Sequence, residues 1–143
     1  MRAYLEIRNL RCTIERPIEQ MKIIIQAPFL AKPCETAVGR GKNVIQFPDE
    51  CVPLLVPDMF YPIKYMQSVY ITATVQFNDL TGVAILPRDF TLPDVFKTFE
   101  LPVTFQFQTF GVLEGEISLI SASEAYVKEQ QIRHYKADRK SVV

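Results

Sequence analysis

The stretch SVYITATVQF, residues 68–77, alternates apolar with mostly polar side chains and is rich in β-branched residues. Its apolar positions share one parity: Val69, Ile71, Ala73, Val75 and Phe77. A period of two residues indicates a strand with one buried face and one wet face. Because most of the chain repeats this pattern on either side, we expect this stretch to be a central strand of an antiparallel, all-β sandwich.

The composition is that of one globular domain. The 143 residues are 48% apolar and 22% charged, which is sufficient for a hydrophobic core. The formal net charge is zero, so bulk electrostatics predict affinity for neither nucleic acid nor membrane. The charges are unevenly spread, because residues 1–42 are mainly basic, residues 43–127 mainly acidic and residues 128–143 basic again. We therefore expect a basic edge, an acidic body and a basic tail unless folding mixes them.

Cysteine usage and the N-terminal sequence both indicate a cytoplasmic protein. Cys12, Cys34 and Cys51 are odd in number, far apart and outside any CxxC motif. This spacing favours three free thiols over a disulfide with one unpaired cysteine. The N-terminal residues are charged and alternating, unlike a signal peptide, and no apolar run approaches the roughly 20 residues that a membrane helix needs.

Other stretches predict further strands. Residues 3–14 change parity near Asn9, which predicts a β-bulge, and residues 21–27 alternate with Lys22 and Gln26 outward. Tight turns are expected at Gly39–Lys42 and at 78–82, and a variable connection with one helical turn near Asp94 at 87–100. We expect Phe105 and Phe107 to point inward. The remaining strands are expected at 34–38, 43–47, 51–56, 83–86, 102–110 and 113–120.

The period changes after residue 121. Ser123 can cap a helix that runs from about residue 124 to residue 140. The apolar stripe of this helix is thin, which is typical of a solvated tail, a linker or the start of a coiled coil. The chain therefore divides into an eight-stranded sandwich, residues 1–121, and a polar helical tail or linker, residues 122–143.

No sequence motif carries catalytic or cofactor chemistry. His134 is the only histidine and falls in the polar tail, so a catalytic triad or a four-ligand zinc site lacks its residues. Gly39-x-Gly41 lacks the third glycine of a dinucleotide site and the following helix. The ten phenylalanines fall mainly on inward parity, which favours a core over a nucleic-acid stacking surface. We expect no enzyme, no metal, no cofactor and no nucleic-acid partner.

Four basic residues are the candidate ligand-binding site: Lys22, Lys32, Arg40 and Lys42. Lys22 points away from the core, and the other three lie in the region that follows its strand. One interpretation is an ordinary soluble surface. The other is a basic concave patch for phosphoinositide, another anionic lipid or an acidic segment of a protein partner.

The order of these segments resembles that of the C2 domain, over about residues 1–121. The segments that carry the resemblance are YLEIRNLRCTI, MKIIIQAPF, NVIQFPDECVPLLV, SVYITATVQFNDLTGVAILP and LEGEISLIS. The resemblance implies a C2-like β-sandwich.

Calcium-binding C2 domains carry several aspartates in two loops. The corresponding stretches here are 15–20, which has no aspartate, and 77–82, which has Asp79 alone. Calcium needs about six to eight oxygen ligands. The resemblance therefore implies a calcium-independent module that binds or scaffolds proteins within a larger cytoskeletal or ciliary protein. The alternative is a peripheral module that binds anionic phospholipid through the basic patch.

Overall fold

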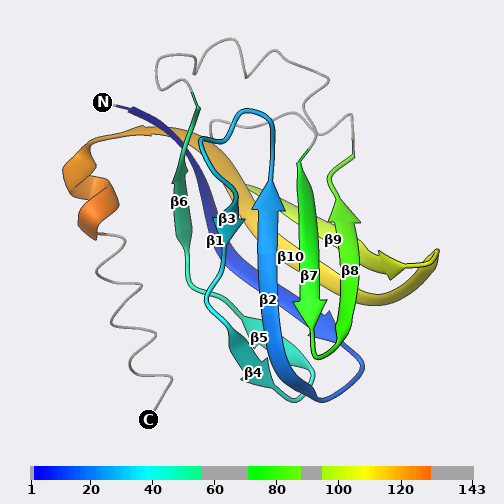
Figure 1. The fold of residues 1–143 in the computed structure, drawn as a ribbon. Coiled ribbons are helices and arrows are strands. Elements are labelled where there is room, and N and C mark those ends of the chain that lie inside the picture. Colours follow the sequence, from blue (N-terminus) through cyan, green and yellow to red (C-terminus); the bar gives the residue numbers. More distant parts are fainter. Residues whose placement is uncertain (1, 56–70, 88–94, 130–143) are drawn as a thin grey trace.

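The computed structural model describes residues 2–55, 71–87 and 95–129, which form strands and one short helix at 124–129 (Figure 1). The strands are β1 (Arg2–Ile14), β2 (Ile18–Gln26), β3 (Cys34–Glu35), β4 (Gly39–Gly41), β5 (Val44–Gln46), β6 (Glu50–Pro53), β7 (Thr72–Phe77), β8 (Leu80–Ile85), β9 (Lys97–Phe105) and β10 (Gln108–Ala122). In the described residues there are ten strands rather than eight, because two edges of the sandwich are each built from two short strands.

The strands pack as two antiparallel layers. The first layer has the order β3–β2–β7–β8, with β4 also on β2. The second has the order β9–β10–β1–β5, with β6 also on β1. The layers join through one pair, Val83 with Thr104, and the Thr104 hydroxyl donates to the Val83 carbonyl oxygen at 3.3 Å. The expected all-β sandwich is confirmed.

The expected central strand and the β-bulge are both confirmed. β7 lies between β2 and β8, and Ala73, Val75 and Phe77 are buried, whereas residues 68–70 lie outside the described residues. In β1 the register against β10 shifts between Arg8 and Arg11, and Asn9 has a φ of 52°. The bulge keeps both parities of β1 inward, because Leu5 and Ile7 before it and Leu10, Cys12 and Ile14 after it are all buried.

The predicted turn at Gly39–Lys42 is wrong. Gly39 to Gly41 form β4, which pairs with β2. Neither glycine has a positive φ. A side chain on Gly39 would collide with Ile45 Cγ2, and one on Gly41 would lie 2.8 Å from Ile45 Cδ1. These glycines therefore allow a close approach between β4 and the side chain of Ile45.

Two predictions for the C-terminal half also need correction. The turn expected at 78–82 is only Asn78–Asp79, because Leu80 already pairs with Phe77. β9 begins at Lys97, within the stretch expected to be a connection, because its backbone pairs with β10 from Ile117 onward. Two further predictions, the helical turn near Asp94 and a crossing between the sheets at the Pro- and aromatic-rich residues 57–64, lie outside the described residues.

Phe105 and Phe107 were expected to point inward and do not. Phe105 is 44% exposed and Phe107 is fully exposed. The chain turns at residues 106–107, so one strand does not run through to Phe110 as expected. Alternation continues along the sequence here, but no described residue of the first layer covers this part of the hairpin.

Candidate functional site

The four basic residues predicted as a ligand site lie along one edge of the first layer and do not converge. Lys22 is on the outer face of β2, and its Nζ lies 2.8 Å from Glu35 Oε2. Lys32 lies in the turn between β2 and β3, at the end of β2 that pairs with β3. Arg40 and Lys42 lie at the other end, where β4 pairs with Ile18 and Met21. Lys32 is therefore separated from Arg40 and Lys42, because β3 and β4 pair with different ends of β2 (Figure 1). The charge of Lys22 is paired with that of Glu35.

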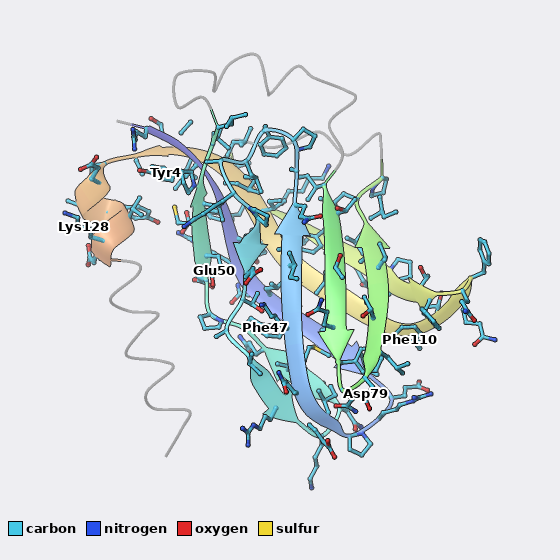
Figure 2. The ribbon with its side chains drawn as sticks, in the orientation of Figure 1. Tyr4, Phe47, Glu50, Asp79, Phe110 and Lys128 are labelled. Atoms are coloured by element: carbon cyan, nitrogen blue, oxygen red, sulfur yellow. The ribbon has the colours of Figure 1, made fainter. Side chains whose placement is uncertain are left out.

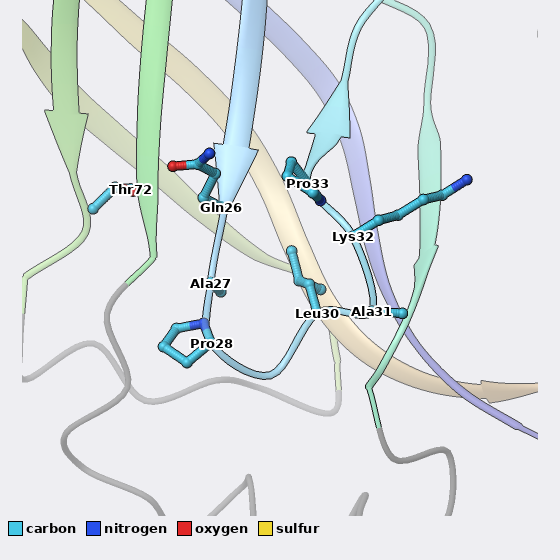
Figure 3. A pocket seen from close by; sticks show the side chains of 8 residues that line it. All are labelled: Gln26, Ala27, Pro28, Leu30, Ala31, Lys32, Pro33 and Thr72. Carbon is cyan, nitrogen blue, oxygen red and sulfur yellow. The ribbon is translucent and has the colours of Figure 1, made fainter.

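A depression of about 450 Å³ lies beside Lys32 (Figure 3). Apolar groups of the turn after β2 line most of it, and Gln26 and Thr72 close one side. In Figure 3 the Lys32 side chain extends away from Gln26 and Pro28. The depression therefore offers an apolar surface with the lysine at its margin.

The outer face of the first layer adjoins this depression and carries the Lys22–Glu35 ion pair, beside which lies an uncharged area. Two rows of paired residues cross it, Ile24–Thr74–Val83 and Gln26–Thr72–Ile85. Val83 is 39% exposed and Ile85 is 54% exposed. We name these six residues the neutral face. Uncharged side chains cost less to desolvate than charged ones, and exposed apolar groups gain from burial, so this face suits contact with another protein surface.

The two stretches that the C2 resemblance assigns to calcium do meet. Asn78 Oδ1 accepts from the backbone N–H groups of Glu19 and Gln20, at 2.9 and 3.4 Å. The Asn78 N–H donates to the Gln20 carbonyl at 2.9 Å. Here an amide joins the loops, and within the described residues no three Asp, Glu, His or Cys side chains group in a way that could hold a metal ion.

The outer face of the second layer mixes the charges that are separate in the sequence. A polar depression of about 490 Å³ contains Glu100, Glu114 and Glu116. Arg11 Nη2 lies 2.8 Å from Glu114 Oε2, and Asn9 Nδ2 donates to Glu116 Oε2 at 3.3 Å. The ion pair raises the pKa of Arg11 through the hydrogen bond to Glu114. Folding therefore places a residue from the basic N-terminal part among the acidic ones.

The helix at 124–129 is bonded to the second layer through a buried carboxylate that the sequence did not reveal. Glu6 is 2% exposed, and the Tyr126 hydroxyl donates to its Oε1 at 3.0 Å. Arg8 Nε lies 3.2 Å from the same oxygen, and the Arg8 guanidinium stacks over Phe96 at 4.0 Å. The expected Ser123 cap is confirmed, because the Tyr126 N–H donates to Ser123 Oγ at 3.2 Å. The chain therefore contacts the sandwich beyond residue 121, up to Tyr126.

The three cysteines are free thiols, as expected. Cys12 and Cys34 are buried and Cys51 is half-buried. Burial raises the pKa of each thiol to about 12. At neutral pH all three are protonated and poorly nucleophilic, because the thiolate is the reactive form.

Comparison with known structures supports the fold directly. The chain is similar to a C2 domain of plant extended synaptotagmin 1, with a TM-score of 0.61 and 15% sequence identity. The match covers 85% of this chain and 97% of that domain. No protein family and no curated protein sequence matches the chain. The protein therefore has a C2-like fold. In the described part of the chain no helix has the length and apolar character needed to span a bilayer.

Proposed function

We propose that this C2-like domain is a non-enzymatic binding module that recruits a protein partner without calcium. The observation that carries the proposal is the neutral face, where Ile24, Val83 and Ile85 stand among threonines on the outside of the first layer. A partner that packs on this face desolvates no unpaired charge. The bridging of the two candidate calcium loops by Asn78 supports the absence of a calcium requirement.

The setting we propose is a larger cytoplasmic protein, cytoskeletal or ciliary. This setting rests on the C2 resemblance, in which domains without the aspartate clusters serve as interaction modules.

A second candidate function is binding to anionic phospholipid, favoured by the exposed Arg40 and Lys42 at one end of the β2 edge. Each basic residue near an anionic bilayer contributes roughly 1 kcal/mol, and salt screens it. Lys22 is already paired with Glu35, so only Arg40 and Lys42 are counted here, and together they contribute about 2 kcal/mol. That is weak binding, so this function ranks second.

The test is affinity capture from cell extract with a matched pair of surface variants. Ile85→Arg places a charge on the neutral face, and Val44→Arg places one on the outer face of the second layer at a similar exposure, 54% against 51%. We expect a set of proteins that binds wild type and Val44→Arg, is lost with Ile85→Arg and persists with a calcium chelator. The same proteins on all three baits, or capture that requires calcium, would contradict the proposal.

Sedimentation with phosphoinositide vesicles tests the second candidate. We expect little wild-type binding. Strong wild-type binding that a Lys22/Arg40/Lys42→Glu triple variant abolishes would put lipid binding first. The Lys32→Glu variant is a useful control, because Lys32 lies at the opposite end of the edge from Arg40 and Lys42.

A further inference from the structure

The turn between β9 and β10 has a backbone that its own residues do not favour. Phe105 pairs with Gln108, so the turn has two residues, Gln106 and Phe107. Both have positive φ values, 48° and 65°. Two-residue hairpin turns with two positive φ angles strongly prefer Asn-Gly, and a bulky residue there is a genuine outlier. The geometry of the turn therefore does not explain why residue 107 is a phenylalanine.

The tip also extends beyond the packed part of the sandwich. Near the tip, Thr104 pairs with Val83 and the Phe110 ring lies 5.3 Å from the ring of Phe77, so both residues still contact the first layer. Beyond Phe110 the hairpin continues away from β8 (Figures 1 and 2). Phe107 is fully exposed and Phe105 is 44% exposed. The Phe107 ring therefore stands in water and the Phe105 ring is partly exposed, both at the end of a two-stranded hairpin.

The tip carries no charge. Residues 101–113 contain no Asp, Glu, Lys or Arg, although the chain as a whole is 22% charged. When a surface contacts its own copy about a twofold axis, a charge that lies near the axis comes close to the same charge of the other copy, which is unfavourable. A neutral tip avoids this repulsion, and the whole chain has a formal net charge of zero.

We propose that two copies of the chain associate through these tips, with Phe105 and Phe107 of one copy packed against the same residues of the other. The contact is isologous, so each favourable aromatic contact occurs twice. The tip is smaller than a standard interface, so the association is weak and concentration-dependent. This inference goes beyond the proposed function, because it uses a different surface and needs no other partner.

Two other surfaces compete as the contact of this tip: a lipid bilayer and a concave pocket of a different protein. The tip has no basic residue to hold lipid headgroups. A different protein would have to supply a deep pocket for a tip that offers only two rings, whereas a second copy supplies the matching rings itself. The observations therefore favour a second copy.

The test is sedimentation velocity over a concentration range of about 100-fold, with a variant that improves the turn while it removes the ring. The Gln106→Asn/Phe107→Gly double variant installs the preferred turn residues. We expect its dimer dissociation constant to rise at least about 10-fold while its melting temperature stays equal or rises. Val38→Ser, which changes a 52% exposed apolar residue between β3 and β4, should leave the dissociation constant unchanged.

Two results would overturn the proposal. One is a double variant that associates as well as wild type. The other is a wild-type protein that stays monomeric over the whole range; if that monomer also floats with uncharged phosphatidylcholine vesicles and the double variant does not, the bilayer is the occupant. Neither result depends on the neutral face, so the proposed function can stand or fail separately.

Discussion

The two neighbouring hairpins β7–β8 and β9–β10 both turn in two residues and both have a positive φ in the turn, yet the residues at their tips and the contacts of those residues differ. At the first tip, Asn78 has a φ of 50°, and its Oδ1 accepts from the backbone N–H groups of Glu19 and Gln20 at the start of β2. At the second, Gln106 and Phe107 take left-handed angles, and the Phe107 ring is fully in water. Asparagine tolerates this conformation well, whereas phenylalanine does not.

The two tips differ in whether the stability of the fold accounts for the residues found there. Asn78 suits its backbone angle and bonds to a neighbouring loop, so stability alone accounts for it. Phe107 suits neither its angle nor its exposure, and such mismatches concentrate at functional positions. The packed part of the β9–β10 hairpin includes Phe110, which contacts Phe77 and Gly82, and the exposed part is the turn beyond it.

The largest effect should come from placing a charge inside the packed hairpin. Val75 is fully buried in β7, so Val75→Asp should cost about 3–5 kcal/mol of unfolding free energy, a large share of the total. Phe105→Asp in the projecting hairpin, or Thr74→Asp on the outer face, should cost about 1 kcal/mol or less. Urea unfolding measures all three. A Thr74→Asp variant less stable than Val75→Asp would reverse the assignment of faces.

An intermediate effect is expected where the two hairpins meet. An added Cβ on Gly82 would lie 2.6 Å from Val103 Cγ1 and 2.8 Å from Phe110 Cζ. Gly82→Ala should therefore cost about 1–3 kcal/mol through overpacking. The neighbouring Thr81→Ala, at an exposed position, is the control and should stay within about 0.5 kcal/mol of wild type. If thermal unfolding found Gly82→Ala as stable as wild type, the packing of Phe110 over β8 would be in error.

The smallest effect compares the two tips directly. Asn78→Ala removes the acceptor for the Glu19 N–H and should cost about 1 kcal/mol, the usual net value of a hydrogen bond. Gln106→Ala should change the unfolding free energy by less than about 0.5 kcal/mol, as at most surface positions. Chemical denaturation of the two variants side by side provides the measurement. Equal losses at both tips would remove the distinction between an anchored and a projecting hairpin.

The predicted site shows the limit of sequence reasoning. Lys22 was correctly placed on the outer side of its strand, but its partner Glu35 lies on another strand and was not predicted. Glu6 alternates outward like an ordinary surface residue, yet Tyr126 from the far end of the chain covers it. Pairing between residues far apart in sequence leaves no periodic signal, so these charges could not be assigned from the sequence.

Alternation alone was enough to predict the buried side chains of β1, β2 and β7 and the bulge at Asn9, because it follows directly from the two-residue repeat of a β-strand. The strand at Gly39–Gly41 could not be read from alternation, because it depends on the close approach of Ile45. The tertiary structure also decided that Phe105 and Phe107 are exposed. Parity fixes which side of a strand a residue faces, but burial requires a second layer opposite that side, and distant parts of the chain determine how far that layer extends.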